Sequence, residues 1–137
     1  MSSKVMKIGV MSRDAFRDRT IAIAKGEYVP KRGEPKVWFE SLKSMAQVLN
    51  KGNQQLLKII IEEKPQSLAE LEAISGRKKS NLSRTLHTLQ KYGVVEIKKV
   101  QQRSVPKVKA TDFKAEFGLS YSAPVKSIPK KKQAVTA

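Results

Sequence analysis

The sequence predicts an α+β fold in which helices predominate, and three observations support this prediction. Apolar residues recur at spacings of three and four over much of residues 41–92, as on the buried faces of helices. Residues 94–109 instead alternate between apolar and polar side chains, as in two β-strands joined by a polar turn. Residues 4–11 alternate loosely in the same way, which predicts a further strand near the N-terminus.

The N-terminal part is expected to be a small strand–helix element followed by a linker. Ser12 can cap a helix over residues 13–25. Its expected apolar positions are Ala15, Phe16, Ile21 and Ala24, and its expected outward cations are Arg13, Arg17, Arg19 and Lys25. Residues 26–36 contain two prolines and two glycines, which is typical of a linker. Because a lone strand has unpaired edges, we assign residues 1–36 a role in dimerisation.

Two helices are predicted between the extended run at residues 37–39 and Pro65. The first, from Ser41 to about Leu49, would bury Leu42, Met45 and Leu49. The second is expected to start at Gly52 or Asn53 and to end before Pro65. Its expected buried stripe consists of Leu56, Leu57, Ile60 and Ile61.

Residues 67–93 have the pattern of two further helices joined by a tight turn at Gly76. Ser67 followed by Glu70 predicts a capping box at the start of the first. The core-facing positions of the two helices are Leu68, Leu71 and Ile74, then Leu82, Leu86 and Leu89. Gly93 is expected to end the second helix, residues 78–92, in a left-handed conformation.

A hairpin of residues 94–99 and 105–109 is expected directly after this helix. Two helices joined by a turn and followed by such a hairpin form a winged helix-turn-helix, which we assign to residues 37–120. Thr111 or Asp112 could cap a short final helix that holds Phe113, Phe117 and Leu119. Residues 121–137, which include three consecutive lysines, are expected to be a basic, disordered tail.

The net charge of +16 over 137 residues implies an anionic partner, with nucleic acid ahead of an acidic membrane surface. The excess is concentrated, because residues 77–109 carry ten Lys and Arg residues against the single acid Glu96. A merely basic protein would spread this charge along the chain. The segment that carries it includes the helix predicted at residues 78–92.

Other classes of function find little support in the composition. There is no cysteine and only one histidine, His87, so we expect no metal site, no cofactor and no enzymatic activity. No apolar run reaches the roughly 18–20 residues of a membrane span, and the N-terminus lacks the apolar core of a signal peptide. We therefore expect a cytoplasmic protein, associated with the nucleoid when bound to DNA.

The residue types on the helix at 78–92 are those that read and hold DNA. Arg can pair with guanine and Asn with adenine in the major groove, so Ser80, Asn81 and Arg84 are the candidate base contacts. The candidate contacts to the DNA backbone are Arg77, Lys78, Lys79, His87, Thr88 and Lys91. At the tip of the hairpin, the candidate wing contacts are Lys98, Lys99, Gln101, Gln102 and Arg103.

Three stretches carry a resemblance to known proteins: Ser67-Leu-Ala-Glu-Leu, the run from Ser80 to Leu89, and Tyr92-Gly-Val-Val-Glu. The segment from about Ser41 to Leu119 resembles the MarR-like winged helix-turn-helix proteins. The whole chain is similar to a prokaryotic family of small predicted transcriptional regulators, some of them antitoxin-like. The resemblance implies duplex DNA binding as a dimer. One departure is Arg77, which stands where relatives often have a capping Ser.

We therefore expect a sequence-specific DNA-binding transcriptional regulator, most simply a repressor, that acts as a homodimer. Two alternatives stay open. The same basic surface would serve a nonspecific architectural protein, or an antitoxin that binds a toxin partner and regulates its own operon.

Overall fold

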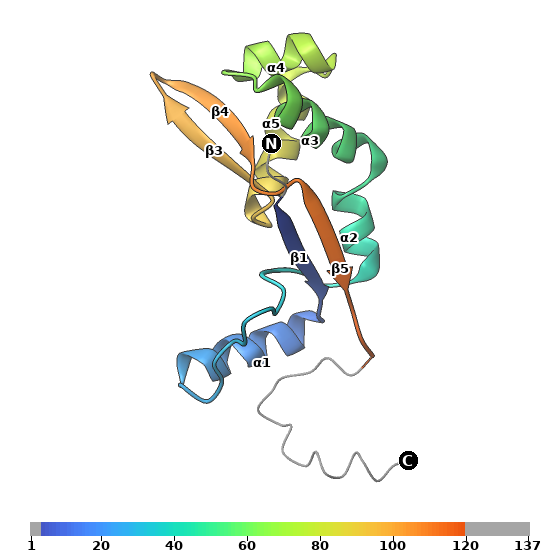
Figure 1. The fold of residues 1–137 in the computed structure, drawn as a ribbon, viewed down its shortest axis with the longest axis vertical. Coiled ribbons are helices and arrows are strands. Elements are labelled where there is room, and N and C mark those ends of the chain that lie inside the picture. Colours follow the sequence, from blue (N-terminus) through green and yellow to red (C-terminus); the bar gives the residue numbers. More distant parts are fainter. Residues whose placement is uncertain (1–3, 120–137) are drawn as a thin grey trace.

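The structure, a computed structural model, describes residues 4–119 (Figure 1). The expected tail at residues 121–137 lies outside the described residues. The elements in chain order are β1 Val5–Val10, α1 Arg13–Ala24, β2 Val37–Phe39, α2 Leu42–Val48, α3 Lys51–Glu63, α4 Leu68–Ser75, α5 Lys79–Lys91, β3 Val95–Val100, β4 Arg103–Val108 and β5 Asp112–Glu116. This is an α+β fold, as the sequence predicts.

A three-stranded parallel sheet joins the two ends of the described chain. Its strand order is β2–β1–β5, with Ile8 opposite Val37 on one side and Ala115 on the other. The expectation of a lone N-terminal strand is therefore wrong, because β1 is the central strand of this sheet. Strands β2 and β5, which pair with β1, both lie after residue 36, so this sheet contains residues from both sides of the predicted domain boundary. The division into domains stays a prediction.

The final helix expected after Thr111 is likewise wrong, since Asp112–Glu116 form strand β5. Thr111 fastens this segment to the first strand: its backbone N–H donates to the Lys4 carbonyl at 2.9 Å, and its Oγ1 accepts from the Lys4 N–H at 2.8 Å. Phe113 packs against the core, opposite Met6. The spacing of Phe113 and Phe117 fits a helix, but pairing with a strand more than 100 residues away decides the outcome.

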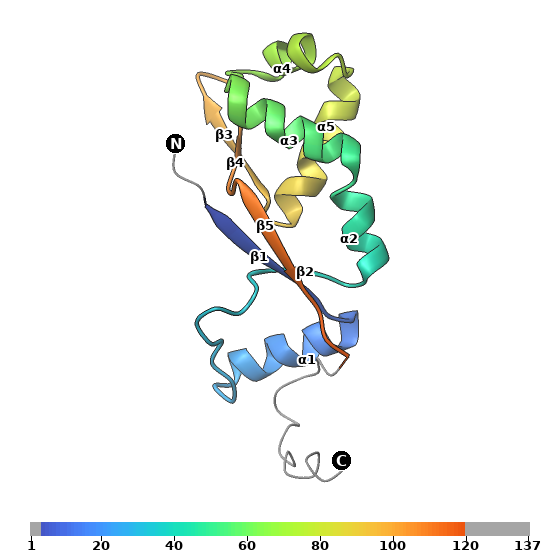
Figure 2. The same cartoon turned by 45° about the vertical axis from the view of Figure 1, so that its right-hand side comes forward.

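The main core lies among α3, α4, α5 and the base of the β3–β4 hairpin (Figure 2). Leu82, Leu86 and Leu89 of α5 are at most 1% exposed, as predicted from their spacing. A smaller cluster of Ile8, Val37 and Phe39 lies on the sheet. Phe39 stacks on Tyr92, with 4.4 Å between ring centroids, so the end of α5 is joined to the sheet.

The helix starts differ from the predicted ones in detail. Helix α3 begins at Lys51, one or two residues before the predicted start, because Asn50 caps it. The Asn50 Oδ1 accepts from the Asn53 N–H at 2.8 Å. Ser67 caps α4 as predicted, but the Glu70 carboxylate accepts from the Gln66 N–H instead of completing the capping box at Ser67. Two residues expected in the core, Leu42 and Ile74, are exposed, because no element covers that side of their short helices.

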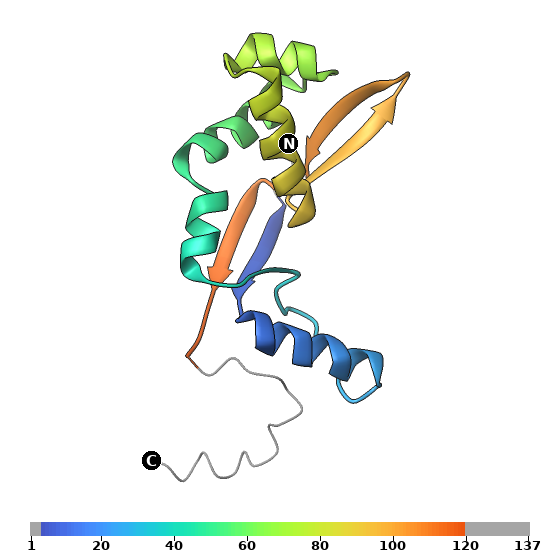
Figure 3. The ribbon, with the colours of Figure 1, turned by 180° about the vertical axis from the view of Figure 1, so that it is seen from behind.

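Helix α1 has the predicted bounds within one residue but presents a different face to the protein. It lies apart from α2–α5, beyond the end of the sheet (Figure 3). Arg19, expected to point outward, is only 9% exposed, whereas Phe16 and Ile21 are 41% and 45% exposed. Arg19 turns inward because Glu34 of the linker binds it at 2.7 Å and its guanidinium lies 5.2 Å from the centre of the Trp38 ring.

Candidate functional site

Helix α5 separates an apolar face from a polar one, and this separation defines the candidate site. Its leucines lie in the core, and Ser80, Asn81 and Arg84 on the other side are exposed. Lys78 is the N-cap residue but makes no capping hydrogen bond with its side chain. The Lys79 backbone N–H donates to the Glu72 carboxylate at 3.3 Å, whereas the backbone N–H groups of Ser80 and Asn81 have no hydrogen-bond acceptor among residues 4–119, so the first turn of α5 offers these two free donors.

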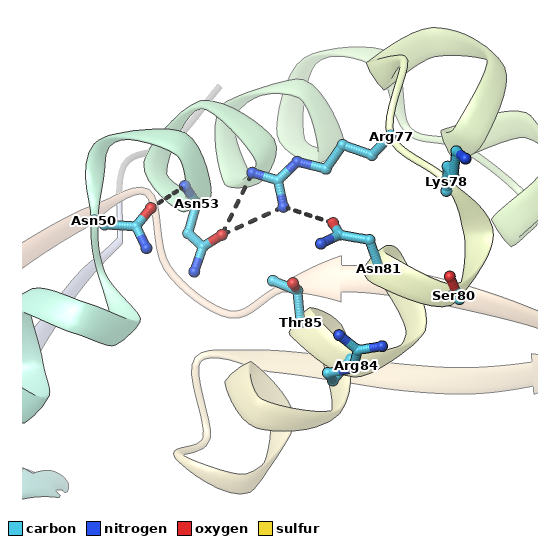
Figure 4. Close-up of a pocket in the computed structure, with 8 residues that line it drawn as sticks. All are labelled: Asn50, Asn53, Arg77, Lys78, Ser80, Asn81, Arg84 and Thr85. Atoms are coloured by element: carbon cyan, nitrogen blue, oxygen red, sulfur yellow. Dashed lines mark hydrogen bonds between the residues drawn. The ribbon is translucent and has the colours of Figure 1, made fainter.

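An open groove of about 660 Å³ runs between the start of α3 and the first two turns of α5 (Figure 4). It is lined by Asn50, Asn53, Arg77, Lys78, Ser80, Asn81, Arg84 and Thr85. All three predicted base-contacting residues therefore lie on one surface, together with two of the predicted backbone contacts. The groove walls are almost entirely hydrogen-bonding side chains, without an acidic residue.

Arg77 occupies the inner wall of this groove and holds its two sides together. Its Nη1 and Nη2 both donate to Asn53 Oδ1 at 3.4 Å, and Nη1 also donates to Asn81 Oδ1 at 3.4 Å. Figure 4 shows the guanidinium between the two amides, with Arg84 on the opposite side of Asn81. Arg77 is half-buried, so the Asn81 amide is oriented by a cation instead of standing free.

The other predicted contacts on α5 lie outside the groove. Lys79, His87 and Lys91 are exposed, and Lys91 lies at the far end of the helix, beside a cavity lined with Trp38 and Tyr92. Thr88 is half-buried, and its hydroxyl donates to the Arg84 carbonyl at 3.2 Å. These residues extend the polar face along the helix without forming one pocket.

The β3–β4 hairpin projects away from the helices, with its tip at Gln101 and Gln102 (Figure 1). Both tip residues have positive φ, 52° and 68°, as a two-residue turn of type I′ requires. The turn is tighter than the five-residue tip expected from the sequence. Every predicted wing residue is exposed: Lys98, Lys99, Gln101, Gln102 and Arg103.

The Lys and Arg side chains of α5 and the hairpin have no ion-pair partner among the described residues. Within residues 4–119, no Lys or Arg side chain between Arg77 and Lys109 forms an ion pair, and the ion pairs present all involve cations before residue 20. The Glu72 carboxylate approaches this region only through the Lys79 backbone N–H, which donates to it at 3.3 Å. Glu96, the one acid of the segment, stands across the hairpin from Lys107. The surface of α5 and the hairpin therefore keeps its positive charge available for an external anion.

Sequence reasoning missed the part of the groove that α3 supplies. Asn53 was expected only as a possible helix start, and Asn50 and Thr85 were not singled out. An Asn-Lys-Gly-Asn run is a capping signal, and nothing local to it indicates a neighbour nearly 30 residues later in the chain. These asparagines line the groove because α3 crosses α5.

Among residues 4–119, no group of three or more His, Asp or Glu side chains is arranged to hold a metal ion. Among the helices described, none has both the length and the apolar character needed to cross a bilayer.

Comparison with known proteins gives one match. Residues 48–115, from the end of α2 to β5, are similar to the family HVO_A0114. No curated protein and no solved structure matches the chain. The matched region contains α3, α4, α5, the hairpin and most of β5, so the similarity covers the groove and both of its walls.

Proposed function

We propose that this protein binds double-stranded DNA through α5 and the β3–β4 hairpin, as a sequence-specific transcriptional regulator. The observation that carries the proposal is the exposed face of Ser80, Asn81 and Arg84 on a helix whose opposite face is locked into the core. In this proposal α3, α4 and α5 with the hairpin form a winged helix-turn-helix of the MarR-like kind, and α5 is the recognition helix.

In this proposal, the side chains at the start of α5 contact the bases. Arg84 has no hydrogen bond from its guanidinium to any described residue, so all its donors are free to pair with a guanine edge. Asn81 keeps its amide nitrogen free while Arg77 holds its oxygen. Pairing with adenine needs both amide atoms, so Asn81 would have to exchange the contact with Arg77 for the base.

Phosphate contacts surround these two residues. The free N–H groups of Ser80 and Asn81 and the side chains of Lys78 and Lys79 favour a phosphate at the helix N-terminus, beside the Lys79 N–H that Glu72 already binds. The exposed cations of the hairpin would hold the backbone of the neighbouring groove. His87, Thr88 and Lys91 continue the contact along α5, although the Thr88 hydroxyl is already engaged with its own helix.

A homodimer would place two α5 helices in successive major grooves, about 34 Å apart on a palindromic site. Residues 1–36 remain our choice for the dimer contact. The support is no longer an unpaired strand but the exposed Phe16 and Ile21 on α1, which stands away from the other helices. Repression of a promoter by such a dimer is the simplest regulatory outcome.

The experiment that tests the proposal is selection of bound duplexes from a random pool, followed by titration of the selected and a scrambled duplex at several salt concentrations. We expect a tighter complex with the selected duplex and a steep loss of affinity with salt for both. Equal affinity for every duplex would favour the nonspecific architectural alternative. Absence of binding to any duplex, with a co-purifying acidic protein, would favour the antitoxin alternative.

A further inference from the structure

A second basic surface lies away from the groove, at the start of the parallel sheet. A cavity of about 710 Å³ opens between β1, the linker before β2, the end of α5 and the residue that follows β4. Five lysines from separate parts of the chain line it: Lys4, Lys7, Lys36, Lys109 and Lys114. It shares no lining residue with the groove on α5.

Most of the positive charge in this cavity is unbalanced. Lys7 is the exception, since it lies 3.6 Å from Glu116 and donates to the Gly33 carbonyl at 2.8 Å. The other four lysines have no ion pair among residues 4–119. The one acidic lining residue, Glu34, is already bound by Arg19 and by the hydroxyl of Tyr28. Because these cations lie on one cavity, an anion bound there would interact favourably with several of them at once.

The lining of the cavity combines the lysines with apolar side chains and backbone. Val5, Met6, Val37 and Tyr92 contribute the apolar lining. Strand β1 pairs with β2 only from Ile8 onward, so on this side its first residues have no neighbouring strand. A concave site of this size, lined by both apolar and cationic side chains, suits a small molecule better than the convex backbone of a duplex.

We propose that this cavity binds a small polyanion, a molecule with two or more phosphate or carboxylate groups on a compact skeleton. The anionic groups would lie between Lys36, Lys109 and Lys114, and the skeleton against Val37 and Tyr92. Because Tyr92 directly follows α5 and stacks on Phe39, the ligand would touch the end of that helix. The proposal stands whether or not α5 binds DNA.

The test is titration of the full chain with inorganic pyrophosphate and, separately, with citrate at constant ionic strength, followed by calorimetry and by backbone amide NMR shifts. The two probes distinguish a phosphate from a carboxylate ligand. The cavity variant is Lys36→Gln with Lys114→Gln; the matched control is Lys43→Gln with Lys58→Gln, which removes the same charge from exposed positions on α2 and α3.

We expect saturable binding of at least one probe, shifts centred on residues 36–37, 92–93, 109 and 114, and a loss of about tenfold or more in the cavity variant only. All four lysines are exposed, so both variants should fold, and their thermal unfolding checks this. Equal losses in both variants, or binding without saturation, would mean an unspecific attraction to a basic protein and would overturn the proposal. So would a cavity variant that loses affinity for duplex DNA but not for either probe, because the cavity would then belong to the DNA interface.

Discussion

Arg77 and Asn53 are 24 residues apart in the chain, yet both terminal nitrogens of the arginine lie 3.4 Å from the Asn53 side-chain oxygen. This contact joins the first turn of α3 to the residue before the N-cap of α5. The same guanidinium reaches Asn81, so one cation sets both the spacing of the groove walls and the orientation of an amide on the candidate surface.

The contact predicts a measurable coupling between Arg77 and Asn53. In a double-mutant cycle with Arg77→Ala and Asn53→Ala, we expect a coupling of about 0.5–1 kcal/mol in the free energy of unfolding. Urea denaturation of the four proteins measures it. Lys78→Ala, which removes a cation without such a contact, should change stability by less than about 0.5 kcal/mol. A coupling indistinguishable from zero would show that the two side chains act independently.

Because one face of α5 is buried, we predict that shortening its central leucine, Leu86, strongly lowers the free energy of unfolding. Leu86→Ala should lower the free energy of unfolding by about 2–5 kcal/mol, because it leaves a cavity in the main core, to which Leu86 belongs. Ser83→Ala, on the exposed side of the same helix, is the control and should have little effect. Similar denaturation midpoints for the two variants would contradict the placement of α5.

We predict that the nearly buried ion pair between Arg19 and Glu34 of the linker contributes strongly to the stability of the protein. Arg19→Ala removes the partner of Glu34 and the cation beside Trp38, and should cost about 3 kcal/mol or more. Arg17→Ala breaks the exposed pair with Asp14 and should cost less than about 1 kcal/mol. Thermal unfolding of both variants tests this, and an equal effect would mean that Arg19 is solvated in solution.

The backbone conformation at the hairpin tip predicts that replacing its two glutamines can raise the stability of the protein. Gln101 and Gln102 both hold positive φ values, which Asn and Gly adopt at lower cost. Gln101→Asn with Gln102→Gly should raise the free energy of unfolding by about 0.5–1 kcal/mol, as judged by urea denaturation. Gln102→Val is the opposite control, since a branched side chain resists the left-handed region. Stabilisation by valine would mean that the turn has another conformation.

Local signals in the sequence predicted most helices and the hairpin, and long-range pairing accounts for what they missed. The leucine spacing of α5, the Ser67 cap and Gly93, with a φ of 82°, are all properties of short stretches, and all are confirmed. Residues 112–116 became a strand because β1 offers an edge more than 100 residues earlier. Arg19 turned inward because Glu34 and Trp38 reach it from the linker.

The candidate site, too, was predictable only in part. The residues of α5 were predictable because a helix repeats every 3.6 residues and its buried face fixes the opposite one. Asn50 and Asn53 were not, since their contribution arises only where α3 crosses α5. The role of Arg77 as a link inside the groove, in addition to any phosphate contact, is also visible only in three dimensions.

The most direct test of the account compares Arg84→Ala with Lys91→Ala on selected and scrambled duplexes at one salt concentration. If α5 reads bases, Arg84→Ala should lose about 1–3 kcal/mol of binding free energy on the selected duplex and little on the scrambled one. Lys91→Ala, which would remove a proposed phosphate contact, should weaken both duplexes by the same factor. Equal losses on both duplexes for both variants would contradict base reading by Arg84.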